Sequence, residues 1–375
     1  MKTEVIQLRN FPDPTAPLRH ARDVLNSGGL VAFPTETVYG LAACADNPQA
    51  LQRLAELKQR PPDKPFTLHI GQMSALDRYV PTLSPRNRKL LRKAWPGPLT
   101  VVFALDQLPQ APDPHGQSPE FTPALYHNNT IGIRLPDHPI AQKLLSSLDA
   151  PVVAPSANLA SAPPPVDADD VLAQLDGHIE LILDSGPTRY RKASTVIKLN
   201  ADDMEILREG VLDGRFLERL RTVVVLLVCT GNTCRSAMAA GFCRHELAKK
   251  LSCPVDQIAR NGYKVVSAGI MALSGAPATP EAQQACRESQ VDISDHRAQL
   301  LGTDIVNEAD YIFAMASSHY QTVVTMAPDA AERTWLLAGD RSIEDPIGMP
   351  LEVYRGCAEL IRRHLAEQLA QHGLI

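Results

Sequence analysis

Two cysteines, an arginine and a serine lie close together in the segment CTGNTCRS, residues 229–236. The segment follows the apolar run VVVLLV (223–228) and precedes small residues at helical spacing. A loop between a buried strand and a helix start can turn its backbone N–H groups inward around an oxyanion. A thiol in that field loses its proton easily, because the thiolate is itself an anion. We therefore expect Cys229 to be a nucleophile for phosphoryl groups.

The other residues of this segment fit the same chemistry. Arg235 can donate two parallel hydrogen bonds to phosphoryl oxygens and would stabilise the transition state. Ser236, at the expected start of the helix, would donate to the thiolate. Gly231 and Asn232 tolerate the positive φ that the turn requires. The predicted phosphate-binding loop comprises Thr230, Gly231, Asn232, Thr233, Cys234 and Ser236.

Transfer of a phosphoryl group to sulfur also requires a proton for the departing oxygen or nitrogen. The segment EDPIGMP (344–350) places Asp345 before a proline, which stiffens the backbone behind the carboxylate. We expect Asp345 to act first as the general acid. It would then act as the general base for the water that hydrolyses the phosphocysteine.

Residues 223–375 resemble the low-molecular-weight protein phosphatases over essentially their whole length. The matching segments are CTGNTCRS, SAG (267–269), ISDHRAQLL (293–301), ADYIFAM (309–315) and DPIGMPLEVYRGCAELI (345–361). The resemblance implies a parallel-sheet α/β/α sandwich and a phosphocysteine mechanism without a cofactor, in which Cys229, Arg235 and Asp345 are catalytic. It also implies a reversible disulfide between Cys229 and Cys234, for which a small buried thiol at Cys234 is the alternative.

Features of these segments bear on the substrate. Thr233 matches the arginine-phosphatase branch of that family, and Ile347 stands where members selective for phosphotyrosine tend to carry an aromatic residue. We expect a phosphoprotein substrate, with phosphoarginine favoured and phosphotyrosine as the alternative. An arsenate reductase on this fold needs a pair of relay cysteines, whereas Cys286 and Cys357 stand alone in the sequence. A protein that only sequesters phospho-ligands is a further alternative.

Polar groups at predicted strand ends characterise the first half of the chain, which has neither a Walker loop nor a GxGxxG motif. In TIGIRLP (130–136), alternation places Arg134 on the face opposite the isoleucines. Lys58 and Arg60 end an amphipathic helix at a proline-rich turn, where their charges suit a polyphosphate. PSAN (155–158) ends an apolar strand with a hydroxyl and an amide that can bind a ligand.

Residues 8–212 resemble the threonylcarbamoyl-AMP synthase family (YrdC-like), with the matching segments in the same order and spacing. These segments are FPTETVYGLAA (33–43), KQRPPDKPFTLHI (58–70), WPGPLTVVF (95–103), IGIRLPDHPIA (131–141), APSAN (154–158) and ASTVIKL (193–199). The resemblance implies that L-threonine, bicarbonate and ATP, with Mg²⁺ on its phosphates, give threonylcarbamoyl-AMP and pyrophosphate. Downstream machinery would then transfer the threonylcarbamoyl group to tRNA.

The resemblance also implies two groups of ligand-binding residues. ATP would be bound by Lys58, Arg60, Ser156, Asn158 and Arg208. Threonine would be bound by Thr35, His69, Arg134 and Ser194. Arg134 would bind its carboxylate, and for His69 a buried core histidine is the alternative. Ala160 and Ser161 depart from the Ser-Gly pair usual in the family, so a glycine that would let backbone approach the nucleotide is missing.

The order of the predicted elements divides the chain near residue 220. Residues 1–215 are expected to form a YrdC-like twisted mixed sheet with helices. Residues 222–375 are expected to form a parallel α/β sandwich with its ligand at the carboxyl edge of the strands. With 375 residues the chain is long enough for two cores. We expect a bifunctional enzyme, with a first half that binds RNA or nucleotide without turnover as the alternative.

Composition and charge exclude some classes of protein. A net charge of −5 argues against a mainly electrostatic nucleic-acid or membrane binder, and no apolar run has the length of a membrane span. The seven cysteines lack the spacing of a zinc site or a disulfide framework, so no metal site is predicted and a reducing cytoplasm is the default. The basic segment 84–93 is interpreted as a weak contact with RNA, double-stranded RNA included, or as a solvated helix. The proline-rich segment 108–123 is interpreted as a lid, an insertion or a mobile segment.

Overall fold

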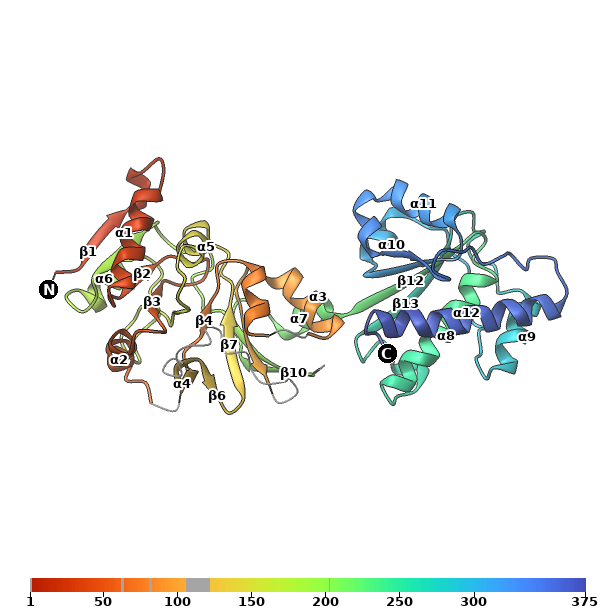
Figure 1. Ribbon diagram of the computed structural model, residues 1–375, viewed down its shortest axis with the longest axis horizontal. Coiled ribbons are helices and arrows are strands. Elements are labelled where there is room, and N and C mark those ends of the chain that lie inside the picture. Colours follow the sequence, from red (N-terminus) through yellow and green to blue (C-terminus); the bar gives the residue numbers. More distant parts are fainter. Residues whose placement is uncertain (1, 62–63, 81–82, 106–121, 202) are drawn as a thin grey trace. The chain divides into compact units, whose positions relative to one another are not determined.

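The computed structural model describes residues 2–61, 64–80, 83–105, 122–201 and 203–375. Their contacts divide into two compact units, Met1–Leu220 and Arg221–Ile375, and each unit is described by itself (Figure 1). In these ranges no helix has both the length and the apolar character needed to cross a membrane. The proline-rich segment 108–123 lies outside the described residues except for its last two positions.

The described residues of the first unit are built around one eleven-stranded sheet. Ten strands follow in the order β1-β9-β2-β3-β8-β4-β7-β5-β10-β11, and β6 pairs with β7. The pairings are mixed, because β4 runs parallel to β7 but antiparallel to β8. The mixed sheet expected for this half is thereby confirmed. The strands are β1 (Glu4–Gln7), β2 (Val31–Phe33), β3 (Gly40–Cys44), β4 (Leu68–His69), β5 (Leu99–Ala104), β6 (Tyr126–His127), β7 (Thr130–Arg134), β8 (Val152–Val153), β9 (Leu181–Asp184), β10 (Thr195–Asn200) and β11 (Asp203–Arg208).

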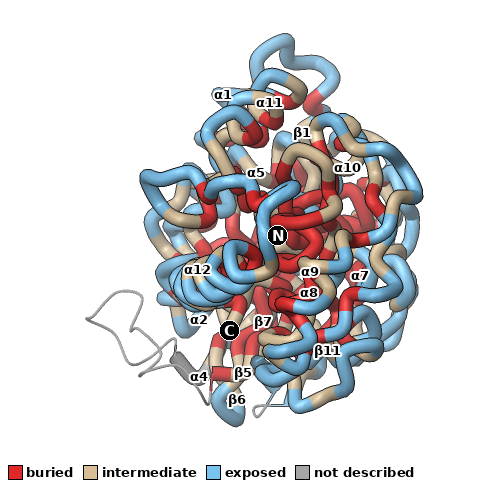
Figure 2. Tube along the Cα trace, turned by 90° about the vertical axis from the view of Figure 1, so that its right-hand side faces the viewer, coloured by how far each residue is buried: buried red, intermediate tan, exposed pale blue. Residues whose placement is uncertain are grey.

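Helices pack against both faces of this sheet and bury two separate apolar clusters. One cluster joins α1 (Thr15–Asn26) and α5 (Pro139–Ser146) to Val31, Phe33 and Val152 of the strands. The other cluster lies under α2 (Pro48–Leu57), α3 (Pro85–Ala94), α6 (Ala168–Leu175) and α7 (Gly214–Arg221). The short helices are η1 (Leu8–Asn10), η2 (Met73–Arg78) and α4 (Thr122–Leu125). The strands β2, β3 and β9 are largely buried, whereas β1 and β11 at the ends of the sheet are largely exposed. Figure 2 shows the buried residues along the chain in red.

Polar side chains cap the first turns of α2 and α3 in this unit. Asn47 precedes α2, and its Oδ1 accepts a hydrogen bond from the N–H of Ala50 at 2.9 Å. Ser84 precedes α3 in the same way.

The basic segment predicted as a solvated helix is this α3, but Arg86 differs from that prediction. Arg86 is buried, with its guanidinium 3.5 Å from Glu218, because it faces α7 rather than solvent.

The second unit contains a four-stranded sheet in the order β13-β12-β14-β15, and all its pairings are parallel. The carboxyl ends of the four strands therefore meet at one edge of the sheet. Cys229 ends the central strand β12 and pairs in register with Gly269 at the end of β13. The predicted parallel sheet is confirmed. The strands are β12 (Val223–Cys229), β13 (Tyr263–Gly269), β14 (Tyr311–Ala314) and β15 (Thr334–Leu336).

Helices cover both faces of this parallel sheet (Figure 1). Because successive side chains of a strand point to opposite faces, both faces of β12 are apolar, which explains its unbroken run VVVLLV. One face of the sheet packs against α8 (Arg235–Lys250), α9 (Pro280–Glu288) and α12 (Leu351–Gln371). The other face packs against α10 (Thr303–Glu308) and α11 (Ser317–Met326). The short helices are η3 (Val255–Gln257) and η4 (Pro328–Arg333).

Two candidate active sites

The loop between β12 and α8 folds around the sulfur of Cys229. Asn232 has a φ of +57°, and its N–H donates to Cys229 Sγ at 3.2 Å. Ser236 Oγ lies 2.9 Å from the same sulfur and accepts from Asn232 Nδ2 at 2.8 Å. Gly231 does not adopt the positive φ expected of it. The helix begins at Arg235, one residue before the predicted start.

Segments distant in sequence hold this loop in shape. Asn232 Oδ1 accepts a hydrogen bond from the N–H of Gln299 at 2.9 Å. His296 Nε2 lies 2.6 Å from the carbonyl oxygen of Asn232. Gly269 is required at the end of β13, because a β-carbon there would lie 2.5 Å from the carbonyl oxygen of Thr230. The SAG segment thus leaves room for the loop, and the segment 293–301 fastens it.

Arg235 is buried beside the loop and connects it to the predicted general acid. Its Nη1 donates to the carbonyl oxygen of Ile343 at 2.9 Å. Its Nη2 donates to Thr230 Oγ1 at 3.1 Å and to Asp345 Oδ2. Its Nε has no hydrogen-bond partner among the described residues. The structure therefore brings the three predicted catalytic residues together, and the unused N–H could bind a phosphoryl oxygen.

The pKa of Cys229 is raised in this structure, which contradicts the expectation of an easily ionised thiol. Burial raises it and is the largest influence, while hydrogen bonds from Ser236 and Asn232 and the charge of Arg235 lower it. Asp345 pairs with Arg235 here, so the carboxylate offsets the positive charge that would stabilise a thiolate. We therefore expect the Cys229 thiol to ionise more readily when Asp345 moves away from Arg235.

Cys234 is buried in the same loop and contacts hydroxyl groups. Its Sγ lies 3.4 Å from Tyr354 Oη and 3.6 Å from Thr279 Oγ1. The pKa of Tyr354 is raised to about 12, mainly because its hydroxyl group is buried. The neighbouring Thr233 is half-buried, and its Oγ1 lies 3.7 Å from Cys234 Sγ. In the structure Cys229 and Cys234 are both free thiols.

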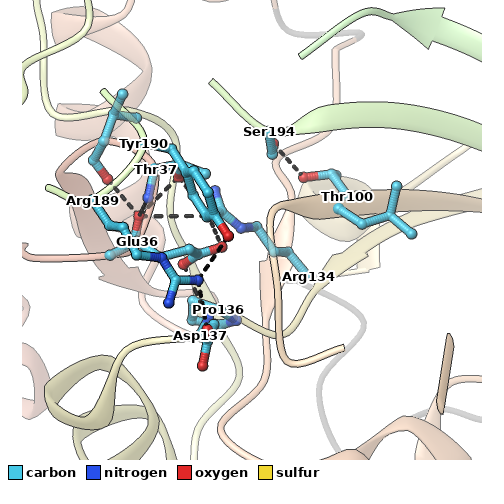
Figure 3. A network of polar contacts seen from close by, with 12 residues as sticks. Glu36, Thr37, Thr100, Arg134, Pro136, Asp137, Arg189, Tyr190 and Ser194 are labelled. Carbon is cyan, nitrogen blue, oxygen red and sulfur yellow. Dashed lines mark hydrogen bonds and ion pairs between the residues drawn. The ribbon is translucent and has the colours of Figure 1, made fainter. Parts of the chain in front are cut away.

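A buried arginine also lies at the centre of a polar cluster in the first unit (Figure 3). Arg134 ends β7, and its Nη2 donates to Glu36 Oε1 at 2.9 Å and to Thr37 Oγ1 at 2.5 Å. The same nitrogen lies 3.5 Å from Thr35 Oγ1. Glu36 Oε2 accepts from the N–H of Asp137 at 3.0 Å. Glu36 therefore fixes the guanidinium of Arg134 beside the hydroxyl groups of the loop between β2 and β3.

Strand register aligns the neighbours of Arg134. His69 on β4 pairs with Arg134 on β7, which pairs with Thr100 on β5. Thr100 Oγ1 lies 2.9 Å from Ser194 Oγ (Figure 3). Arg208 donates to the carbonyl oxygen of Ser194 at 2.9 Å. The residues predicted to bind threonine are thus gathered here, and Arg208, predicted to bind ATP, contacts one of them.

His69 is buried in this group. Its Nδ1 lies 3.2 Å from the carbonyl oxygen of Thr67, and its ring meets Phe33 edge-to-face. Burial, and to a smaller extent the charge of Arg134, lowers the pKa of His69 to about 3. The imidazole is therefore neutral at physiological pH and can accept or donate a hydrogen bond without adding charge.

Lys58, Ser156 and Asn158 form a second polar group of this unit. Lys58 Nζ lies 3.0 Å from the carbonyl oxygen of Ser156, 2.7 Å from that of Asn158 and 3.0 Å from Asn158 Oδ1. Burial, with the nearby charge of Arg60, lowers the pKa of Lys58 to about 8. Ser161 stands where the family has glycine, and its φ is +65°. The loop therefore keeps a left-handed conformation there without the glycine.

Arg60 folds back over its own turn. Its Nε donates to the carbonyl oxygen of Lys64 at 2.9 Å, and its Nη2 donates to that of Pro65. The guanidinium stacks over the ring of Phe66, 4.6 Å from its centroid. In this structure Arg60 shapes the turn that follows α2, and its charge contributes to the lowered pKa of Lys58.

Some residues of the two sites were not predicted, namely Glu36, Thr37, Thr100 and His319. Glu36 and Thr37 directly follow the predicted Thr35, so a search for an acid to pair with a buried arginine could have found them. His319 gave no signal, because it contacts Thr230, 89 positions away in the sequence.

Family models match both units of the chain. A model for Sua5, YciO and YrdC proteins, described as "Telomere recombination", matches residues 23–210. A model described as "Low molecular weight phosphotyrosine protein phosphatase" matches residues 224–372. The chain therefore belongs to the Sua5/YciO/YrdC family through its first unit, and its second unit is a low-molecular-weight phosphatase domain.

Individual relatives agree with the first of these matches. The threonylcarbamoyl-AMP synthase of Bacillus subtilis is 40% identical over 193 residues, which are 52% of this chain and 53% of that protein. The threonylcarbamoyl-AMP synthase of Photobacterium profundum is 34% identical over 196 residues, which are 52% of this chain and 98% of that protein. The chain spans about half the length of several curated relatives that it matches, the Bacillus subtilis protein among them.

A solved structure also resembles the chain. The crystal structure of P. abyssi Sua5 in complex with L-threonine is 26% identical and superposes with a TM-score of 0.50. The superposition covers 72% of this chain and 92% of that one. The first unit therefore has the fold of P. abyssi Sua5, which was crystallised with L-threonine bound.

Proposed function

We propose that the first unit forms threonylcarbamoyl-AMP and pyrophosphate from L-threonine, bicarbonate and ATP. Relatives that match this half carry the name of that activity, and a similar structure contains L-threonine. The observation that carries the proposal is the buried Arg134, whose Nε has no hydrogen-bond partner among the described residues. A guanidinium fixed by Glu36 with an N–H to spare is suited to the carboxylate of an amino acid.

The reaction requires alignment and charge neutralisation more than a covalent nucleophile. The threonine amine attacks bicarbonate or carbon dioxide, and the carbamate oxygen then attacks the α-phosphate of ATP and releases pyrophosphate. Arg134 would bind the threonine carboxylate, with His69, Thr35 and Ser194 around it. Lys58 would order the loop that holds Ser156 and Asn158 against ATP, aided by Arg60 and Arg208, and Mg²⁺ would arrive on the ATP phosphates. The adenylate would supply tRNA modification in the cytoplasm.

The test of this function is ATP–pyrophosphate exchange that depends on threonine and bicarbonate. We expect exchange in the wild-type chain and in Arg22→Ala, which removes an exposed arginine paired with Asp23. We expect Arg134→Ala to abolish it, because the carboxylate loses its guanidinium. An absence of exchange in the wild-type chain would instead favour a module that binds nucleotide or RNA without turnover.

We further propose that the second unit, which we assign to residues 222–375, hydrolyses phosphoproteins through a phosphocysteine. The residues 1–215 would be the synthase domain. The phosphatase proposal is carried by Arg235, which contacts both the loop around Cys229 and the carboxylate of Asp345. The proposed nucleophile, transition-state clamp and general acid therefore lie around one loop, as transfer of a phosphoryl group to sulfur requires.

The reaction proceeds in two displacements at phosphorus. The thiolate of Cys229 attacks as the bond to the leaving group breaks, Arg235 stabilises the transferring oxygens, and Asp345 gives its proton to the leaving nitrogen or oxygen. Asp345 then takes a proton from water, which attacks the phosphocysteine and releases phosphate together with the thiolate of Cys229. Cys229→Ser should abolish hydrolysis of p-nitrophenyl phosphate, and a variant with unchanged turnover would exclude this role for Cys229.

Phosphoarginine is the substrate that we favour. Thr233 stands in the loop at the position of the arginine-phosphatase branch, and the exposed Ile347 offers no aromatic ring to a phosphotyrosine. Initial rates on matched phosphoarginine and phosphotyrosine peptides test this preference. We expect the wild-type chain to prefer phosphoarginine and Thr233→Ile to shift the preference toward phosphotyrosine. If the preference stays the same in the variant, Thr233 does not determine it.

A further inference from the structure

His319 is a buried histidine at the same sheet edge as Cys229. It lies in the first turn of α11, which follows β14, and β14 pairs in parallel with β12 so that Ala314 is in register with Val228. The residue is 2% exposed, and its Nε2 lies 3.0 Å from Thr230 Oγ1. No role is assigned to His319 in the mechanism given above.

The hydrogen bonds of Thr230 determine which group donates. Arg235 Nη2 lies 3.1 Å from Thr230 Oγ1, and a guanidinium can only donate, so the hydroxyl oxygen accepts this bond. The described residues offer Thr230 Oγ1 only one other partner, His319 Nε2. If His319 accepts there, the hydroxyl proton is used and only Nδ1–H is left unpaired. If His319 donates there, both the hydroxyl proton and Nδ1 are left unpaired, so the first arrangement is favoured.

The charges around His319 agree with an accepting imidazole. Burial, and after it the charge of Arg235, lowers the pKa of His319 to about 4, while Asp345 acts in the opposite direction. The ring is therefore neutral at neutral pH. Packing alone does not explain the imidazole, because its buried Nδ1 has no partner among the described residues, and an aliphatic side chain would fill the space without burying that nitrogen.

We propose that His319 is a positioning residue for phosphoryl transfer, which holds the hydroxyl of Thr230 so that its oxygen stays directed at Arg235. Asp345 must leave Arg235 to protonate the leaving group. The Thr230 oxygen and the Ile343 carbonyl then remain to orient the guanidinium over the phosphoryl group. This role presupposes the phosphatase activity proposed above.

The test is a double-mutant cycle in the full chain, with kcat and KM measured on p-nitrophenyl phosphate. His319→Leu removes the acceptor, and His319→Gln keeps an acceptor at similar reach without a titrating ring. Thr230→Val removes the group through which His319 acts. We expect His319→Leu to lower kcat about ten- to hundredfold with little change in KM, because a misdirected clamp weakens the transition state. His319→Gln should restore most of the loss.

The cycle distinguishes positioning from packing. In the Thr230→Val background we expect His319→Leu to change kcat by less than about twofold, because coupled residues are not additive. Full additivity, or a His319→Gln variant as slow as His319→Leu, would overturn the proposal. If His319→Leu fails to fold, Thr230→Val and His319→Gln still test the proposal. It requires Thr230→Val to lower kcat and His319→Gln to keep most of the wild-type rate, and failure of either expectation overturns it. If Cys229→Ser hydrolyses p-nitrophenyl phosphate as fast as the wild-type chain, the proposed phosphatase mechanism itself is wrong. The positioning role of His319 would then have no basis.

Discussion

Each unit of the molecule contains a buried arginine paired with a carboxylate, and the two pairs differ in how the carboxylate is held. The side chains of Arg134 and Glu36 are 7% and 2% exposed, and Glu36 also accepts from a backbone N–H. Arg235 is similarly buried at 4%, but Asp345 is 35% exposed and lies on a loop. The acid is enclosed in the first unit and accessible in the second.

This difference shows how one pair of residue types can serve two kinds of chemistry. An enclosed carboxylate cannot exchange its partner without leaving a buried charge uncompensated, so Glu36 can only orient Arg134. An accessible carboxylate can release its arginine to a phosphoryl group and exchange protons with solvent and substrate, as a general acid requires. We therefore expect Glu36 to matter mainly for stability and Asp345 mainly for turnover.

The largest expected effect is on turnover in the second unit. Asp345→Asn should lower kcat on a phosphorylated peptide by about 10²–10⁴, because an amide cannot protonate the leaving group. Steady-state kinetics with Glu344→Gln, an exposed neighbouring acid, provide the matched control, which should remain near wild type. An Asp345→Asn variant within about tenfold of wild type would mean that another group supplies the proton.

A second comparison concerns stability and uses the same kind of substitution in each unit. Glu36→Gln should lower the free energy of unfolding of the first unit by about 3–5 kcal/mol, because Arg134 is left buried without its partner. Asp345→Asn should lower that of the second unit by less, because water can replace at Arg235 a carboxylate that is 35% exposed.

The two tryptophans make this comparison measurable, because Trp95 lies in the first unit and Trp335 in the second. Urea denaturation followed by fluorescence in a Trp335→Phe background reports on the first unit, and a Trp95→Phe background reports on the second. Equal losses in the free energy of unfolding of the two units would show that enclosure of the carboxylate does not determine how much the ion pair stabilises its unit.

The stability of the first unit should also depend on pH through His69. Its pKa is lowered to about 3 in the folded protein and is near 6.5 when unfolded, so between these values the unfolded state binds the extra proton. Its contribution is complete above pH 6.5 and falls by about 1.4 kcal/mol for each pH unit below it. Denaturation at several pH values should show a shallower slope for His69→Gln, and identical slopes would exclude this linkage.

The smallest expected effect is a change in the ionisation of Cys229. Asp345→Asn removes the carboxylate that offsets the charge of Arg235, so the pKa of the Cys229 thiol should decrease. The pH dependence of iodoacetamide alkylation, corrected with Cys229→Ser for the other cysteines, measures the shift. A profile that moved to higher pH would mean that Asp345 assists thiolate formation.

Candidate site residues could be predicted from the sequence where they occur together in one or two short segments. Cys229 and Arg235 belong to one short segment, and Asp345 precedes a stiffening proline, so residue type and spacing sufficed to predict that they share a site, and the structure brings them together. The parallel sheet followed from the order of strands and helices, and alternation correctly opposed Arg134 to the isoleucines of β7, which pack in the core beneath α2 and α3.

Properties that depend on the folded surroundings could not be predicted in this way. Arg134 and Glu36 are 98 positions apart, and only the packing of β7 against the loop after β2 joins them. The pKa of Cys229 depends on how deeply the loop is buried, which no local motif encodes. Arg86 fitted the pattern of a basic surface helix, but the packing of α3 against α7 buries it.

Binding of inorganic phosphate to the second unit tests the exchange of partners at Arg235 most directly. Isothermal titration calorimetry would compare Cys229→Ser with the double variant Cys229→Ser/Asp345→Asn, so that no turnover intervenes. If phosphate displaces Asp345 from Arg235, the double variant should bind phosphate several-fold more tightly, because neither competition nor charge repulsion remains. Equal or weaker binding by the double variant would show that Asp345 is not the exchangeable partner of this arginine.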